Sequence, residues 1–206
     1  MSQFSGLGNY KRILEIKNFP DYPGNTMNLV RIEYMRRLHL TLFLDPMESM
    51  VIEYIRKRFN PEQFRLIPAH ITLCRENELE DLTRIKHVLE TLDFEEFDLS
   101  LGEIREISAE LGVWVTLLDP QGKVPQLREM ILGGASPSAG NFTPHITLMH
   151  PMNSKLNRQK VETIKEVELS GMIRISRISL IEQQEDQIWK TLEEYQLKKP
   201  MNFLKP

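Results

Sequence analysis

The sequence His-Ile-Thr-Leu occurs twice in this chain, beginning at His70 and again at His145. Each copy lies in a short run of apolar and β-branched residues that predicts a strand. In a strand, residues i and i+2 point to the same face, so each copy presents an imidazole beside a hydroxyl, that of Thr72 or of Thr147. The Ile and Leu of each copy then point to the opposite face, where we expect a core.

Landmarks around the two copies recur in the same order, about 75 residues apart, which indicates an internal duplication. An Asp-Pro pair ends a predicted strand at residues 45–46 and again at residues 119–120. After each motif, the sequence at residues 98–101 resembles the one at residues 177–180. We therefore predict an α+β fold of two duplicated β-α-β-α-β units, bilobal and built mainly from antiparallel sheets that flank a central cleft.

The predicted lobes are residues 37–111 and residues 112–206, the second with a C-terminal tail, and together they form one bilobal domain. Residues 1–36 are interpreted as an N-terminal extension without an assigned role. Besides the motif strands, alternation and helical spacing predict strands at residues 38–44, 97–107, 113–118, 172–182 and 188–197, and helices at residues 47–59, 78–92, 124–132 and 156–169. The segment between Pro61 and Pro68 is interpreted as a loop.

The composition is typical of a globular chain, because 206 residues with 41% hydrophobic content can bury one sizeable core. The start of the sequence has neither a signal-peptide pattern nor a long apolar run, so we expect a cytoplasmic monomer with no membrane partner. The single cysteine, Cys74, excludes an internal disulfide and a cysteine-rich zinc site. With a net charge of −3, binding to long nucleic acids is not indicated, and a nucleic-acid partner would be an RNA terminus or a small nucleotide.

Two imidazoles that face each other across a cleft suit in-line displacement at phosphorus. Histidine has an ordinary pKa near 6.5, so at neutral pH one ring can accept a proton while the other donates one. Threonine hydroxyls can donate hydrogen bonds to the phosphoryl oxygens, where charge must be held in the transition state. This chemistry needs no metal and no cofactor, and we expect neither.

Two other interpretations of the histidines remain open. Each ring could be packed and hydrogen-bonded in a core, although two identical copies in a duplicated frame make this a weaker explanation than for one copy. A zinc site is the second alternative, but His-x-Thr lacks the usual ligand spacing. Alternation also places His150 on the opposite face from His145, which leaves no third imidazole nearby.

The paired motifs, the second within Phe142-Thr-Pro-His-Ile-Thr-Leu, resemble the two-histidine (2H) phosphoesterase superfamily, which includes bacterial RNA 2′,3′-cyclic phosphodiesterases often named 2′-5′ RNA ligases. The resemblance covers about residues 37–197. It implies a bilobal α+β fold and metal-independent cleavage or ligation of phosphodiesters. By position it implies catalytic roles for His70 and His145 and phosphate contacts for Thr72 and Thr147, with His145 as the base and His70 as the acid.

The function expected from this resemblance is a metal-independent phosphodiesterase that opens 2′,3′-cyclic phosphates of RNA ends or small nucleotides. One alternative is a reversible 2′-5′ RNA ligase, which runs the same chemistry with a hydroxyl in place of water. Another is a module that binds a nucleotide or an RNA end without turning it over.

Several further residues are candidates for substrate contacts. Arg75 follows the first motif and could reach a phosphate or could simply be solvated. Phe142 and Trp114 could stack on a base or pack in the core. His39, in a third His-x-Thr, could line the cleft, contact the substrate or pack in the core.

Three more features have a plainer interpretation. Cys74 is expected on the face of His70 and Thr72, as a thiol of the cleft wall or the core. The glycine-rich residues 133–140 could bring backbone N–H groups to an anion, but an ordinary linker is favoured. The basic residues 56–58 are interpreted as the solvated end of a helix.

Overall fold

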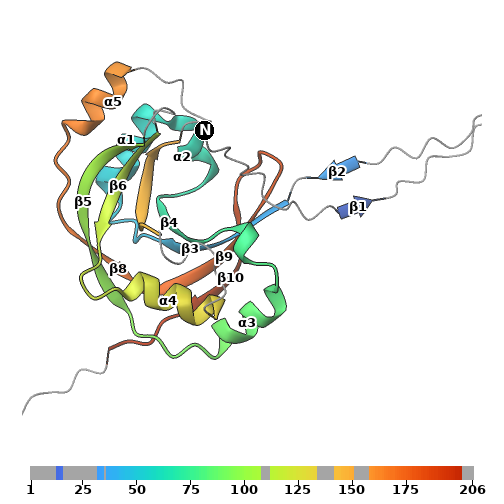
Figure 1. The fold of residues 1–206 in the computed structure, drawn as a ribbon. Coiled ribbons are helices and arrows are strands. Elements are labelled where there is room, and N and C mark those ends of the chain that lie inside the picture. The colour runs from blue at the N-terminus through green and yellow to red at the C-terminus, as the bar shows by residue number, and fades with distance from the viewer. Residues whose placement is uncertain are drawn as a thin grey trace, which may run out of the picture.

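The computed structural model of the protein describes residues 13–15, 32–34, 36–107, 112–133, 142–150 and 158–200. These residues form a mixed α+β fold around one curled sheet of eight strands (Figure 1), and each pair of neighbouring strands is antiparallel. In spatial order the strands are β10 (Lys190–Gln196), β9 (Arg177–Gln184), β3 (Arg36–Phe43), β4 (His70–Cys74), β7 (His145–Met149), β6 (Gly112–Leu118), β5 (Phe97–Ile107) and β8 (Met172–Ile175). The predicted α+β class and antiparallel pairing are confirmed, and the strands predicted for the sheets on either side of the cleft form one eight-stranded sheet.

The two motif strands, β4 and β7, lie next to each other at the centre of this sheet. On either side the order is mirrored, since β3 and β6 flank the centre and β9 and β5 come next. The similar sequences at residues 98–101 and 177–180 lie in β5 and β9, the two strands that hold mirrored places in this order. The spatial arrangement agrees with an internal duplication.

The two halves of the sheet do not correspond to two continuous stretches of the chain, because each half contains strands from both predicted units. β5 precedes residue 112 but pairs with β6, whereas β9 and β10 come late in the chain and extend the half that contains β3. The helices cross over in the same way, because α1 (Met50–Phe59) packs against β7 and α4 (Lys123–Leu132) packs against β4. The boundary predicted at residues 111 and 112 therefore does not coincide with the midline of the sheet.

Most predicted elements are present, and their ends differ from the predicted ones by a few residues. The helices predicted at 78–92 and 156–169 are α3 (Leu82–Glu90), which follows a 3₁₀ turn η1 (Glu76–Glu78), and α5 (Arg158–Lys165). The predicted strand 172–182 is two strands, β8 and β9, separated at Ser176. The loop predicted after Pro61 is wrong: residues Pro61–Leu66 form α2, because proline is well suited to the first helical position, where its missing N–H has no partner to lose.

The core lies on one face of the sheet, where the apolar residues of both motifs point. Ile71, Leu73, Ile146 and Leu148 are all fully buried there. Their burial fixes the register of the two central strands, since a shift by one residue would turn these side chains to the opposite face. The imidazoles and hydroxyls are consequently directed away from the core.

Buried arginines from two helices fasten both ends of β4. Arg56 of α1 donates to the carbonyl of Ile67 just before the strand, at 2.7 Å. Arg128 of α4 donates to the carbonyl of Leu73 near its end and forms an ion pair with Glu78. Both arginines are almost fully buried, so the prediction that residues 56–58 are a solvated helix end is wrong for Arg56.

Of the predicted N-terminal extension, the structure describes β1 (Ile13–Glu15) and β2 (Ile32–Tyr34), which pair as a separate two-stranded sheet, and Arg36, which begins β3. The rest of residues 1–36 lies outside the described residues. Within the described part of the chain, no helix is long and apolar enough to cross a membrane.

Candidate active site

The antiparallel pairing of β4 and β7 brings the four motif side chains together. Ile71 stands opposite Ile146, so one step along the strands Thr72 faces His145 and, in the other direction, His70 faces Thr147. The two histidines therefore lie diagonally across a strand pair, each with a threonine opposite it and another two residues along its own strand. Both strands have the same alternation of burial, which leaves the His and Thr side chains half-buried and the residues between them buried.

Each motif histidine is held by the same local hydrogen bond. The Nδ1 atom of His70 lies 2.7 Å from the carbonyl oxygen of Pro68, and Nδ1 of His145 lies 2.8 Å from that of Thr143. A carbonyl oxygen can only accept, so Nδ1 must carry a proton in both rings. In the neutral histidine, Nε2 then has the free lone pair, and this nitrogen is available to accept or return a proton.

Burial favours the neutral form of both rings. It lowers the pKa of His70 from 6.5 to about 3 and that of His145 to about 4. The carbonyl hydrogen bonds partly oppose this, whereas the nearby charge of Arg56 further lowers the pKa of His70 and that of Arg75 lowers the pKa of His145. A bound anion would counteract these effects, because a negative charge stabilises an imidazolium.

Aromatic rings from the neighbouring strands border the two histidines. The ring of Trp114 on β6 meets His145 edge to face, with 3.9 Å between ring centroids. Phe43 on β3 has a similar orientation against His70, at 6.1 Å. These contacts restrict the rotation of both imidazoles and remove water from one side of each ring.

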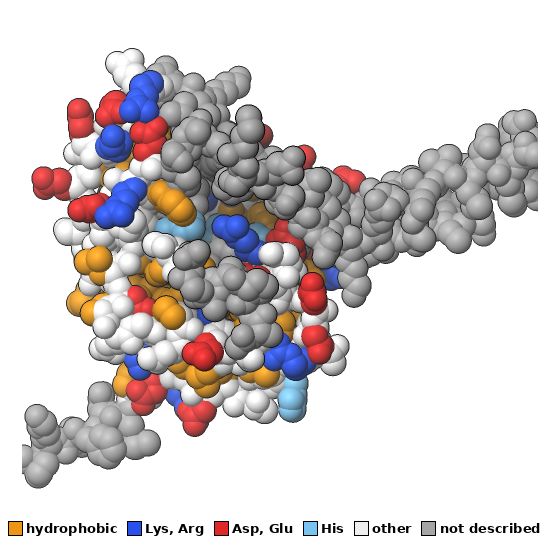
Figure 2. Space-filling view, in the orientation of Figure 1, with side chains coloured by type: hydrophobic (Ala, Val, Ile, Leu, Met, Phe, Trp, Pro, Cys, Tyr) orange, Lys and Arg blue, Asp and Glu red, His pale blue; other side chains and the backbone are white. Residues whose placement is uncertain are grey.

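A pocket of about 290 Å³ opens beside His145. Its lining combines motif side chains, basic residues and aromatic rings: Thr72, Leu73, Arg75, Asn77, Glu78, Trp114, Arg128, Phe142, Thr143 and His145. In the space-filling view, histidine and basic side chains reach the surface close together near the middle of the face shown (Figure 2). The pocket therefore offers a positive charge, neutral donors and apolar walls next to a motif histidine.

Of the sequence candidates, Arg75, Phe142 and Trp114 line this pocket. The guanidinium of Arg75 is exposed, and no hydrogen bond or ion pair of it is found among the described residues. Phe142 is half-buried and lies under the guanidinium of Arg128, 4.1 Å from ring centroid to Cζ.

Sequence reasoning did not identify Arg128 and Glu78 as parts of the pocket wall. Their ion pair, at 2.5 Å, is nearly inaccessible, since the two side chains are 5% and 7% exposed. The available signal was helical spacing: Arg128 is four residues after Val124 and three before Ile131, so it lies on the apolar face of its helix.

His39 lies on the same face of the sheet but outside the pocket lining. Its Nε2 atom is 2.7 Å from a carboxylate oxygen of Glu76, and its ring lies against Trp189 with 4.6 Å between centroids. Arg37 in turn lies over the Trp189 ring. The structure thus shows His39 engaged in a local polar and aromatic cluster, and a substrate contact for it stays a prediction.

Cys74 departs from the predicted alternation. The register between β3 and β4 shifts between Leu40 and Thr41, so Thr41 pairs with Thr72 but Leu40 pairs with Cys74. Cross-strand partners share a face, which places the thiol with the core rather than with the motif side chains. It is fully buried, and this burial raises its pKa to about 12.

Of the glycine-rich residues 133–140, only Gly133 is described, and it ends α4 in the left-handed conformation that glycine favours. Among the residues that the structure describes, no group of three or more His, Cys, Asp or Glu side chains converges as metal ligands would.

The curled antiparallel sheet, with two His-x-Thr strands side by side at its centre, defines the protein as a 2H phosphoesterase-type molecule. Residues 43–187 match the 2′-5′ RNA ligase superfamily, and the chain belongs to that superfamily. No curated protein sequence matched the chain.

Several solved structures share the fold. The phosphate complex of Escherichia coli LigT is 19% identical, with a TM-score of 0.54 over 79% of this chain and 98% of LigT. A structure described as a phosphoesterase has 17% identity and a TM-score of 0.56, over 79% of this chain and 99% of its own. LigT has also been solved with 3′-AMP, and this structure has 18% identity over 79% of this chain and 98% of LigT. At these identities the likeness concerns the fold.

Proposed function

We propose that the protein is a metal-independent phosphodiesterase that opens 2′,3′-cyclic phosphates at RNA ends or in small nucleotides. The observation that carries this proposal is the pair of diagonal histidines whose Nδ1 atoms are both bound to main-chain carbonyls. Two equivalent Nε2 atoms are thereby left to act as a base and an acid. Because the imidazoles supply both proton transfers, the reaction needs no metal-bound water.

In the proposed reaction, water attacks the cyclic phosphorus while His145 Nε2 removes its proton. The bond between phosphorus and one ribose oxygen breaks on the opposite side, and His70 Nε2–H protonates that oxygen. Thr72 and Thr147 donate hydrogen bonds to the non-bridging oxygens, where negative charge is held in the transition state. The base and acid assignment follows the family resemblance.

Both histidines favour the neutral state without a substrate, so the acid must gain its proton when the substrate binds. A phosphodiester carries one negative charge, which raises the pKa of an adjacent imidazole. Arg75, at the edge of the pocket, is proposed to contact the phosphate. Phe142 and Trp114 are proposed to border the nucleoside, and His39 to contact a more distant part of an RNA end.

The relatives support the proposed class of substrate. LigT has been solved in complex with phosphate and with 3′-AMP, and 3′-AMP is the kind of monoester that opening a 2′,3′-cyclic nucleotide yields. We infer that this protein likewise acts on a nucleotide or an RNA end, as a cytoplasmic monomer. A non-catalytic binding module would use the same cleft and would bind such nucleotides without product.

A second candidate reaction is reversible 2′-5′ RNA joining, which is favoured by the description of the matching superfamily. A ribose hydroxyl would then take the place of water, with the histidines in the same roles. Joining of cleaved RNA halves without ATP would identify this reaction.

The test uses the metal-free protein in EDTA with the four nucleoside 2′,3′-cyclic monophosphates and an RNA oligomer that ends in a cyclic phosphate. Chromatography of the products should show conversion to an acyclic monophosphate. Tight binding of these compounds without product from pH 5 to 8 would favour the binding module instead. If the protein neither binds nor converts any of these compounds, the proposed substrate class is wrong.

A further inference from the structure

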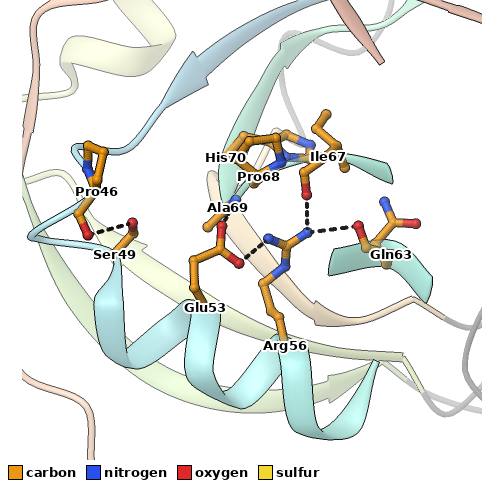
Figure 3. A network of polar contacts seen from close by, with 9 residues as sticks. All are labelled: Pro46, Ser49, Glu53, Arg56, Gln63, Ile67, Pro68, Ala69 and His70. Carbon is orange, nitrogen blue, oxygen red and sulfur yellow. Dashed lines mark hydrogen bonds and ion pairs between the residues drawn. The ribbon is translucent and has the colours of Figure 1, made fainter. Parts of the chain in front are cut away.

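The chain segment just before His70 is fastened to α1 by a network of polar contacts (Figure 3). Glu53 accepts a hydrogen bond from the backbone N–H of Ala69 at 2.5 Å. The other carboxylate oxygen of Glu53 accepts from Arg56 at 2.6 Å. Arg56 also donates to the carbonyl of Ile67 at 2.7 Å. Both residues beside Pro68 are therefore held by the same carboxylate and guanidinium pair.

We propose that Glu53 is a positioning residue that orients the imidazole of His70 through the peptide group between Pro68 and Ala69. The inference rests on the proposed function, in which His70 transfers a proton. In many active sites a carboxylate binds the catalytic histidine directly. We assign the same role to Glu53, which acts on His70 through one intervening peptide group.

The geometry of a peptide group makes this connection effective. The Pro68 carbonyl and the Ala69 N–H belong to one planar trans unit, so the two groups point in opposite directions. Glu53 binds the N–H side of this unit, and His70 Nδ1–H binds the carbonyl side at 2.7 Å. Fixing the N–H therefore fixes the direction of the carbonyl, which sets the orientation and the tautomer of the imidazole.

The carboxylate also strengthens the carbonyl as an acceptor. Hydrogen bonds in a chain polarise one another, and a charged acceptor on the N–H increases the negative charge on the oxygen of the same peptide group. The negative charge of Glu53 is thereby transmitted toward the Nδ1 proton of His70. The side chain of Arg56 is 1% exposed, and its ion pair with Glu53 holds this carboxylate in place.

The second motif lacks this arrangement, although its histidine makes the same local hydrogen bond. His145 donates to the carbonyl of Thr143, and the peptide group of that carbonyl ends at the nitrogen of Pro144. Proline has no N–H, so no carboxylate can bind the far side of this peptide group. The chain therefore contains its own comparison, with one histidine supported through a peptide group and one without such support.

The test follows both histidines by NMR in protein labelled with ¹⁵N, using long-range couplings that distinguish Nδ1 from Nε2. In the unaltered protein both rings should carry the proton on Nδ1. In Glu53→Gln, the Nδ1 proton of His70 should move upfield, as its hydrogen bond weakens, and the tautomers should mix. The signals of His145 should stay unchanged, as should those of both rings in the control Glu62→Gln, which alters an exposed residue of α2.

Removing Glu53 alone leaves Arg56 as an unpaired buried charge, and this could unfold the protein. The double variant Glu53→Gln/Arg56→Met removes both charges and is expected to fold. Because Arg56 itself acts on His70, the His70 signals of the double variant are compared with those of Arg56→Met, and their difference carries the test if the single variant does not fold. An unchanged His70 signal in the folded variant would overturn the proposal. Equal changes at His70 and His145 would also overturn it, because they would indicate a general disturbance.

Kinetics give a second readout. Loss of the outer partner of a metal-binding histidine typically costs about 10- to 100-fold. We expect a loss of this order in kcat with little change in KM, since Glu53 is not among the residues that line the pocket. A rise in KM with kcat unchanged would contradict a positioning role. If the unaltered protein has no turnover, the proposed function fails, but the NMR comparison still tests the link between Glu53 and His70.

Discussion

At the scale of single residues, the two motif histidines differ from free histidine in two ways that affect proton transfer. Each has Nδ1 bound to a carbonyl two residues earlier, which leaves Nε2 as the reactive atom. Each also has a pKa lowered by burial, to about 3 for His70 and about 4 for His145. The neutral imidazole that these pKa values favour is ready to act as a base. The histidine that acts as the acid must gain its proton with the help of the bound substrate.

These pKa values predict an acidic optimum for kcat/KM, which reports on the free protein. Above its pKa, the protonated fraction of the acid falls about tenfold per pH unit, while the base is already deprotonated. We therefore expect kcat/KM to fall as the pH is raised from 5 to 8. The measurement is a profile of initial rates at low substrate concentration, and an optimum above pH 7 would contradict the lowered pKa values.

At the scale of elements, β4 is the strand that the rest of the site depends on. Arg56 of α1 holds the segment before it, and Arg128 of α4 binds the carbonyl of Leu73 near its end. The two helices come from different sequence units, so the position of β4 depends on both. The Arg128–Glu78 ion pair in addition forms part of the pocket wall.

Glu78→Gln tests this dependence, because it leaves the buried guanidinium of Arg128 without its counter-charge. Breaking a buried pair typically costs about 3 to 5 kcal/mol of unfolding free energy, and we expect the lower end since Arg128 keeps its bond to Leu73. Urea unfolding measures the change. The control Glu80→Gln alters an exposed carboxylate two residues away and should stay within about 0.5 kcal/mol. Equal stability of both variants would show that the ion pair does not support the strand.

Some elements could be predicted from the sequence because their signal is local. The alternation around His70 and His145 identified both central strands and the shared face of imidazole and hydroxyl. Local signals failed where pairing with another strand decides the outcome, as with Cys74, which a register shift turns into the core. The contact between Glu53 and the Ala69 N–H joins a helix to the segment just before β4, 16 residues later in the chain, and no spacing rule predicts it.

At the scale of the whole molecule, the exchange of strands ties the two sequence units into one sheet. β3 depends on β9 for its outer neighbour, and β5 depends on β6 and β8. The order of elements along the chain could not reveal this, because it does not specify which strands pair. A division of the chain at residues 111 and 112 separates strands that the fold requires to be together.

Residues 37–111 alone should consequently remain unfolded, since β3 and β5 would each lack all partners from the second unit. Circular dichroism of this fragment should show no cooperative thermal transition. The matched fragment, residues 37–197, retains all eight strands of the large sheet apart from the first residue of β3, and should unfold cooperatively. A cooperative transition in the shorter fragment would contradict the interdependence of the two units.

The most direct test of the two-histidine site is the replacement of each motif histidine by alanine, with turnover of 2′,3′-cyclic nucleotides measured in EDTA. General acid or base catalysis by one imidazole typically accelerates a reaction about 10²- to 10⁴-fold. His70→Ala and His145→Ala should therefore each lose at least about 100-fold in kcat, with the circular dichroism spectrum unchanged. His87→Ala, which removes an exposed histidine of α3, should retain full activity. Turnover that persists in either folded motif variant would show that the paired histidines do not carry the chemistry.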